Sequence, residues 1–318
     1  MMAALLDPRA MLCFQNTGRE AMRTYDFLGE LEEAIERPIV LLEYRPPPTK
    51  GGRPCESRVE VVTHNTLDLD GGPFEMLMEA INAFRAKCGK GKIAPWWKSR
   101  ICTTYMKTRC ARTYIEQHLG CDRWTEAVGL RADEPSRVER LSVGHPKHVK
   151  RWAPLNEANV MKGDVVKFWE EQDFALNLPE YMGNCTGCFL KDQADLARAS
   201  KHPEMDWRWW HDMELRYPGW GGKNFEGYDR LAREADARIA IEAALRAGVE
   251  PANDGTMGRE RFRLVVIQEQ KRIKKQTIPF SCGCEGSTAL ANMEPEEEDD
   301  YILSLPSEDD EPACAVGK

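Results

Sequence analysis

The sequence predicts an α/β protein with a mostly parallel sheet flanked by helices. Short apolar runs typical of buried strands alternate with longer amphipathic stretches up to about residue 130. Apolar residues make up 42% of the chain and charged residues 30%, the balance of a protein with a buried core. No apolar run approaches the roughly 18 residues of a membrane helix, and 1–6 lacks the basic flank of a secretory signal. We therefore expect a cytoplasmic protein that binds no membrane.

The strands and helices are expected in a simple alternating order. The apolar runs predict strands at 10–14, 39–44, 58–63 and 126–130. Helices are expected at 19–35 and 103–119, and between them a helix that carries Phe74, Leu77, Met78, Ile81 and Phe84 on one face. After Lys191 the pattern favours helices without strands, and 262–268 fits either type.

Three parts of different character follow from this pattern. Residues 1–200 form the expected α/β domain, residues 201–284 a helical extension, and residues 285–318 a disordered acidic tail. The tail holds eleven acidic residues and one lysine, so its net charge is −10, against −8 for the whole chain. Residues 1–284 therefore carry a net charge of +2, and local clusters of basic residues can still attract phosphate.

Two segments after predicted strands suit an anionic ligand. Asn16–Glu20 is the turn from a strand into a helix, where free N–H groups favour anions. In the segment 129–137, Gly129 permits close backbone approach, and Arg131 and Arg137 offer bidentate groups for phosphate or sulfate. The alternative for Arg131 is a surface ion pair with Asp133 or Glu134.

The cysteines suggest a metal site. There are eleven, an odd number in a chain without a secretory signal, which favours reduced thiols over disulfides. The spacing Cys185-Thr186-Gly187-Cys188 lets both sulfurs bind one metal ion or cluster. Cys102 and the pair Cys282 and Cys284 could complete it. An unligated or redox-active pair is the alternative.

Four sequence blocks in order resemble a known family. The blocks are Asn16–Glu20, Arg100-Ile101-Cys102-Thr103 with Met106-Lys107, Gly129–Arg137, and Gly183–Lys191. They resemble proteins of the phosphoadenosine phosphosulfate (PAPS) reductase-like family, above all its bacterial and phage branch, over about residues 1–215. The resemblance implies an adenine nucleotide α-hydrolase-like fold, with PAPS, adenosine phosphosulfate (APS) or ATP across the carboxyl ends of the strands.

The resemblance also assigns site residues by matching position. For the nucleotide it implies Asn16, Thr17, Gly18, Arg19, Glu20, Lys107, Gly129, Arg131, Asp133, Glu134 and Arg137. Family members with a cysteine before the lysine and a later CxxC often carry a [4Fe–4S] cluster. Cys102, Cys185 and Cys188 match three ligands, with Cys284 or Cys282 as the fourth and Cys110 as the alternative. Zinc would satisfy the same thiolates.

One family feature has no counterpart here. The family opens with a strand and a Ser-Gly-Gly-x-x-Ser phosphate loop, and 1–6 resembles the end of the helix that follows them. Either the gene starts upstream or the protein is a shortened relative. Backbone N–H groups of such a loop cradle phosphate, which arginine side chains alone do not reproduce, and no catalytic residue is assigned.

Two functions remain open. The resemblance implies an enzyme of sulfur transfer or sulfo-group reduction that works with a protein electron donor or sulfur-transfer partner. The alternative is a non-catalytic nucleotide- and metal-binding partner in a phage or DNA-modification assembly. The acidic tail and the scattered basic residues argue against direct nucleic-acid binding.

Overall fold

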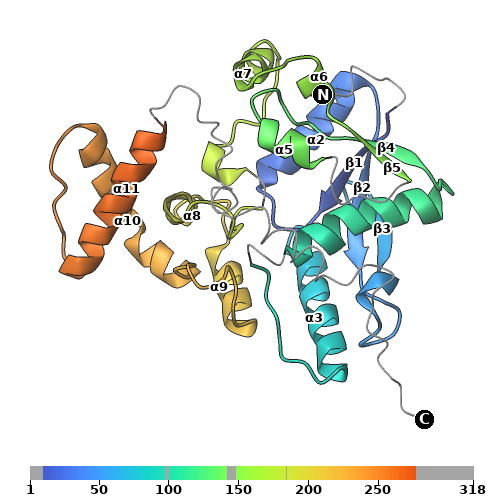
Figure 1. Ribbon diagram of the computed structural model, residues 1–318, viewed down its shortest axis with the longest axis horizontal. Helices are drawn as coiled ribbons and strands as arrows, with labels where there is room; N and C mark the ends of the chain where they lie inside the picture. The colour runs from blue at the N-terminus through green and yellow to red at the C-terminus, as the bar shows by residue number, and fades with distance from the viewer. Residues whose placement is uncertain (1–9, 97–99, 142–147, 184, 277–318) are drawn as a thin grey trace.

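Strands lie on one side of the molecule and a group of helices extends from the other (Figure 1). The computed structural model describes residues 10–96, 100–141, 148–183 and 185–276. The expected α/β class is confirmed, with helices outnumbering strands among these residues. The expected acidic tail, 285–318, lies outside the described residues. No helix in the described ranges has both the length and the apolar character to cross a membrane.

The strands form two small sheets. The first contains β1 (Leu12–Asn16), β2 (Ile39–Arg45) and β3 (Arg58–Val62) in that order. β1 and β2 are parallel, whereas β2 and β3 are antiparallel. The second sheet pairs β4 (Trp124–Ala127) with β5 (Val149–Trp152) in parallel. The expected mostly parallel sheet is therefore divided, and only partly parallel.

One strand and one helix type were not expected. β5 has the sequence Val-Lys-Arg-Trp, too short and too charged to stand out as an apolar run. The helix expected at 103–119 contains two π-helical stretches, η2 (Thr103–Arg109) and η3 (Tyr114–His118), separated by α4 (Cys110–Thr113). π-Helices are rare and often lie at functional sites.

Several helical segments of the α/β body have proline in their first turn, namely η1 (Pro54–Glu56), α3 (Gly72–Lys87), α5 (Pro135–Arg140) and α6 (Pro154–Glu157). In the first turn the missing N–H costs no hydrogen bond. The remaining helical segments are α2 (Met22–Ile35), α7 (Lys162–Glu170) and η4 (Glu180–Met182).

After residue 192 the described chain is helical, as expected. The helices are α8 (Gln193–Ala199), α9 (Trp207–Arg216), α10 (Tyr228–Arg246) and α11 (Arg259–Gln276). The side chains of Asp192 and Asp206 accept the N–H groups of Ala194 and Trp209 at 2.9 and 3.2 Å, which caps α8 and α9. The ambiguous segment 262–268 is helical because it belongs to α11.

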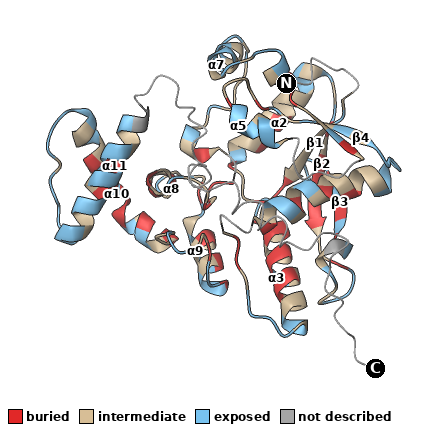
Figure 2. Ribbon diagram, in the orientation of Figure 1, coloured by how far each residue is buried: buried red, intermediate tan, exposed pale blue. Residues whose placement is uncertain are grey.

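One core joins the sheet to the C-terminal helices. Leu42 and Phe74 from the α/β body share a buried cluster with Trp210, Tyr228 and Leu231. Burying aromatic side chains of this size contributes several kcal/mol in total. The C-terminal helices α9 and α10 therefore pack directly on the body. The expected boundary at residue 200 does not divide the hydrophobic core. Figure 2 shows buried residues along α3 and in α9.

Candidate functional site

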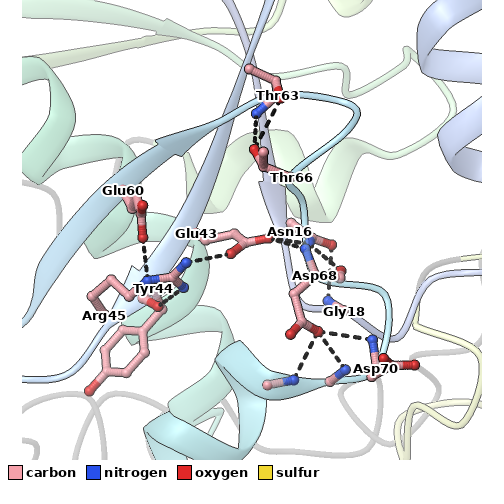
Figure 3. Close-up of polar contacts among 12 residues, drawn as sticks. Asn16, Gly18, Glu43, Tyr44, Arg45, Glu60, Thr63, Thr66, Asp68 and Asp70 are labelled. Carbon is pink, nitrogen blue, oxygen red and sulfur yellow. Dashed lines mark hydrogen bonds and ion pairs between the residues drawn. The ribbon is translucent and has the colours of Figure 1, made fainter.

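Asn16 ends β1 and joins three segments of the body. Its Nδ2 donates to Glu43 Oε1 at 2.8 Å and to the Asp68 carbonyl at 2.7 Å, as Figure 3 shows. Its Oδ1 accepts the N–H of Gly18 and the hydroxyl of Tyr25, each at 2.9 Å. Both amide protons and both lone pairs are used. Asn16 therefore fixes the turn at the strand end, and its side chain is occupied by the protein itself.

Asp68 shapes the loop before α3. Its Oδ1 accepts the N–H groups of Asp70, Gly71 and Gly72 at 2.8 to 2.9 Å (Figure 3). Gly18 has a φ of 75°, and a Cβ there would lie 2.7 Å from the Gly71 nitrogen. Only glycine allows the two backbones to touch at this position. The two loops at the carboxyl ends of the strands are thus locked together.

The N–H groups of the turn after β1 are already occupied. Glu20 Oε2 accepts the N–H of Thr17 at 3.3 Å and of Arg19 at 3.2 Å, and lies 3.1 Å from the Tyr25 hydroxyl. Burial, followed by the charge of Glu20, raises the pKa of Tyr25 well above its usual range. An internal carboxylate thus stands where the sequence predicts that an anionic ligand binds.

The CxxC segment docks onto this turn. Cys185 Sγ lies 3.2 Å from Thr17 Oγ1 and 3.6 Å from Glu20 Oε1. The Thr186 N–H donates to the Arg19 carbonyl at 2.8 Å. Burial raises the pKa of the Cys185 thiol far above its usual range, and Glu20 raises it further. Two predicted sites that are 165 or more residues apart in the chain therefore meet.

The C-terminal helices hold the CxxC segment from the other side. A Cβ at Gly187 would lie 2.5 Å from the Trp210 ring, so the backbone packs directly on the indole. Trp210 Nε1 donates to Thr186 Oγ1 at 3.3 Å, and the Tyr228 hydroxyl donates to the Gly187 carbonyl at 2.5 Å. The cysteine pair is thereby positioned by α9 and α10, in the main core.

Cys102 reaches the same place from the π-helix. Burial, followed by the nearby Cys188, raises the pKa of the Cys102 thiol to about 11. Lys107 follows Cys102 by five residues, the spacing that i→i+5 hydrogen bonding brings together. Burial lowers the pKa of Lys107, but Cys185, Glu20, Cys102 and Cys188 together raise it more. The three predicted cysteine ligands and the predicted lysine are thus close enough in the fold to influence one another's pKa.

A second lysine completes the thiol cluster. Lys191 Nζ donates to the Thr186 carbonyl at 2.9 Å. Burial lowers its pKa to about 8, against the opposing effect of Cys188 and Cys185. We call Cys102, Lys107, Cys185, Cys188 and Lys191 the thiol–lysine cluster. Its two cations can offset negative charge on thiolates or on a bound anion.

The side chain of Arg19 turns away toward α9. Its guanidinium carbon lies 4.2 Å from the centre of the Trp209 ring, and Nη1 lies 3.4 Å from Asp206 Oδ2. Nη2 donates to the Asp70 carbonyl. Cation–π stacking and an ion pair therefore use this arginine to join the loops to α9.

The arginines after β4 are paired with carboxylates. Arg131 Nε donates to Asp133 Oδ1 at 2.9 Å, and its Nη1 lies 3.5 Å from Glu134 Oε2. Arg137 pairs with Glu134 Oε1, and Glu134 is buried. Hydrogen bonding and charge from Arg131 outweigh burial and lower the pKa of Asp133. Arg131 therefore forms the ion pairs that were the alternative to binding an anion. Gly129, two residues before Arg131, is exposed.

The fourth predicted metal ligand is not placed. Cys282 and Cys284 lie outside the described residues. Cys110, the alternative, donates its thiol to the Tyr105 carbonyl at 3.3 Å, and burial raises its pKa to about 12. Across the ranges that the structure describes, no group of three or more His, Cys, Asp and Glu side chains has metal-site geometry.

Several residues of this site were not predicted. Tyr25, Glu43, Asp68 and Thr186 carry its polar network, yet single polar residues next to apolar runs resemble surface positions in the sequence. Glu43 is 0% exposed, paired with Arg45 at 2.9 Å. The one available signal in the sequence was Glu43, a carboxylate inside the apolar run of β2. A buried charge needs partners, so Glu43 indicates a polar network nearby.

Comparison with known proteins gives one distant relative. No protein-family model matches the chain, and no solved structure does. The chain is 26% identical over 201 residues to a protein of Escherichia phage lambda described as "Uncharacterized nin region protein ORF290". The match covers 60% of this chain and 60% of the phage protein.

Proposed function

We propose that the chain is a PAPS reductase-like, adenine-nucleotide-binding protein of sulfur transfer or sulfo-group reduction. One observation carries the proposal: Cys185 lies 3.2 Å from Thr17 in the turn after β1, and Cys102, Cys188, Lys107 and Lys191 are close enough to influence one another's pKa. A sulfated or phosphorylated adenosine at the carboxyl ends of the strands would lie next to these groups.

The thiol–lysine cluster fits a metal in its donor chemistry. Three thiols would supply three of four ligands for a [4Fe–4S] cluster or for zinc, and Cys284 or Cys282 would supply the fourth. An iron–sulfur cluster provides redox chemistry when bound, whereas zinc does not. The raised pKa values of Cys102 and Cys185 keep the thiols protonated without metal, so metal binding would release protons.

Lys107 is the best candidate for a ligand contact. Among the described residues it forms no hydrogen bond and no ion pair within 4.0 Å, although four acidic groups raise its pKa. Arg131 and Arg137, by contrast, both form ion pairs with Glu134. These ion pairs must break or rearrange before either arginine binds phosphate or sulfate. We therefore expect Lys107 to bind the anionic part of the nucleotide more directly than either arginine.

The metal part of the proposal is tested by composition. Protein prepared anaerobically is expected to be brown and to contain iron in near-stoichiometric amount, and Cys185→Ser is expected to lose it. Cys121→Ser, which changes an exposed cysteine outside the cluster, should keep the metal. Neither iron nor zinc in the unaltered protein would refute the cysteine assignment.

The nucleotide part is tested by calorimetry with APS and PAPS. Lys107→Ala is expected to weaken binding by about 1.5–3 kcal/mol, the range for a charged hydrogen bond. Arg131→Ala tests the arginines after β4 by the same measure, and Arg233→Ala, whose side chain is 70% exposed on α10, is the control. No binding of either nucleotide would refute this part even if metal is present.

A non-catalytic role in a phage assembly is the second candidate. The relative in Escherichia phage lambda favours a phage protein. Nucleotide binding without sulfite release, measured with a reductant present, would support this candidate over the enzyme.

A further inference from the structure

Basic residues are concentrated in one stretch of the chain. Between Glu79 and Glu116 there is no acidic residue and there are nine basic ones: Arg85, Lys87, Lys90, Lys92, Lys98, Arg100, Lys107, Arg109 and Arg112. Residues 1–284 as a whole carry a net charge of only +2. The rest of residues 1–284 therefore carries a net negative charge, and much of the positive charge lies between Glu79 and Glu116.

The end of α3 displays part of this stretch on the surface. Lys87, Lys90 and Lys92 are exposed, and Figure 2 shows the lower end of α3 in the exposed colour. The loop after the helix has a defined shape, because the Lys90 N–H donates to the Arg85 carbonyl and Arg85 Nε donates to the Gly91 carbonyl, both at 2.8 Å. Lys87, Lys90 and Lys92 therefore extend from one helix end and loop whose backbone has a defined shape.

A second basic segment packs against the same helix end. A Cβ at Gly51 would lie 3.5 Å from the Ala83 carbonyl and 3.6 Å from Lys87 Cδ, so the β2–β3 connection touches the last turns of α3. This connection, with the first residue of β3, adds exposed cations. We define the basic end as Lys50, Arg53, Arg58, Arg85, Lys87, Lys90 and Lys92.

Few carboxylates neutralise the basic end. On these elements the acidic residues are Glu56, which accepts the Arg53 N–H at 3.2 Å, Glu60, which pairs with Arg45, and Glu75 and Glu79 in α3, of which Glu75 pairs with Arg216. In the part of the chain that the structure describes, Lys50, Lys87, Lys90 and Lys92 form no ion pair within 4.0 Å. Arg131 and Arg238, by contrast, are paired with two carboxylates each.

We propose that the basic end binds the phosphodiester backbone of a nucleic acid. The cations are spread over a helix end and a neighbouring connection, which suits a row of phosphates better than one small anion. Lysine is a point charge without a fixed hydrogen-bonding plane, so binding is independent of base sequence. This surface does not depend on the thiol–lysine cluster, and it differs from the expectation that nucleic acids are not bound directly.

The test is fluorescence anisotropy of the full chain with a labelled 20-base-pair duplex at increasing NaCl. Binding is expected to weaken with salt, and each lost phosphate contact lowers the slope of log K against log salt by about 0.9. Replacing Lys87, Lys90 and Lys92 together by Glu is expected to reduce affinity more than about 30-fold at 0.1 M salt and to flatten this slope by about 2.7.

The matched control reverses the same number of exposed charges elsewhere. Lys150, Lys167 and Lys201 replaced by Glu change the net charge equally and should leave affinity within about twofold if the basic end is the site. Equal losses in both variants, or no binding by the unaltered chain at 0.05 M salt, would overturn the proposal. Competition by polyglutamate as strong as by unlabelled duplex, charge for charge, would assign the surface to an acidic polypeptide instead.

Discussion

The Thr17 hydroxyl lies between Glu20 and Cys185, 2.7 Å from the Glu20 Oε1 oxygen and 3.2 Å from the Cys185 sulfur. Thr17 belongs to the turn after β1, and Cys185 belongs to the CxxC segment. Thr17 is 1% exposed, so solvent cannot replace its hydroxyl as a partner. One buried side chain therefore connects the predicted nucleotide and metal regions.

Thr17→Val should destabilise the protein by about 1.5–3 kcal/mol. Valine keeps the shape but leaves a partly buried carboxylate oxygen of Glu20 without its hydroxyl donor. Urea unfolding followed by circular dichroism measures the change. Thr125→Val, at an exposed position of β4, should stay within about 0.5 kcal/mol, and equal effects would argue against the Thr17 contact.

Gly187→Ala should cost about 1–3 kcal/mol, because its Cβ would lie 2.5 Å from the Trp210 ring. The control is Gly163→Ala in α7, where a Cβ would meet no atom within 4 Å. That change should stabilise the protein by about 0.5–1 kcal/mol through helix propensity. Thermal unfolding of both variants checks the two signs, and a stable Gly187→Ala protein would contradict the packing.

Arg238→Ala should destabilise the protein by about 3 kcal/mol. Arg238 is 3% exposed and pairs with Glu226 at 2.6 Å and Glu234 at 3.1 Å, and removing one partner leaves buried charge. The value stays at the low end of the usual range because Arg261 also pairs with both carboxylates. Arg233→Ala on the same helix, where the side chain is 70% exposed, should change stability by less than about 0.5 kcal/mol.

Cys102 should react slowly with iodoacetamide in metal-free protein. Its pKa of about 11, against an ordinary 9.0, leaves about 100-fold less thiolate at pH 8. The rate should rise about tenfold per pH unit up to pH 11. Peptide mapping by mass spectrometry gives this rate separately from that of the exposed Cys121.

The same shift has a consequence for stability. Because the folded state favours the neutral thiol, the contribution of Cys102 is complete below about pH 9 and is lost as the pH rises to 11. A Cys102 rate equal to that of Cys121 at pH 8 would show that the thiol is not buried.

The sequence predicted most elements because their apolar periodicity is local. β2 and β3 lie within a few residues of their expected bounds, and α3 contains the five apolar residues expected on one helix face, since the buried faces repeat every second residue or every three to four residues. β5 was not predicted because two of its four residues are charged. The division of the sheet was not predicted either, since strand pairing depends on contacts distant in sequence.

The candidate site was predictable in residue type but not in contacts. Cys102, Cys185 and Cys188 could be grouped by spacing and resemblance, and their grouping as metal ligands stays a prediction. Local sequence could not reveal that Glu20 takes up the N–H groups of its own turn, or that Glu134 occupies Arg131 and Arg137. The basic end was not predicted either, because it combines two segments about 30 residues apart in the sequence.

The hydrogen bond from Thr186 to the Arg19 carbonyl has a thermodynamic consequence. A ligand that shifts the turn after β1 must also move the CxxC backbone, so occupancy of either place changes the affinity of the other. Linkage requires the two effects to be equal in size. Nucleotide titrations of metal-loaded and metal-free protein would then differ by the same factor as metal titrations with and without nucleotide.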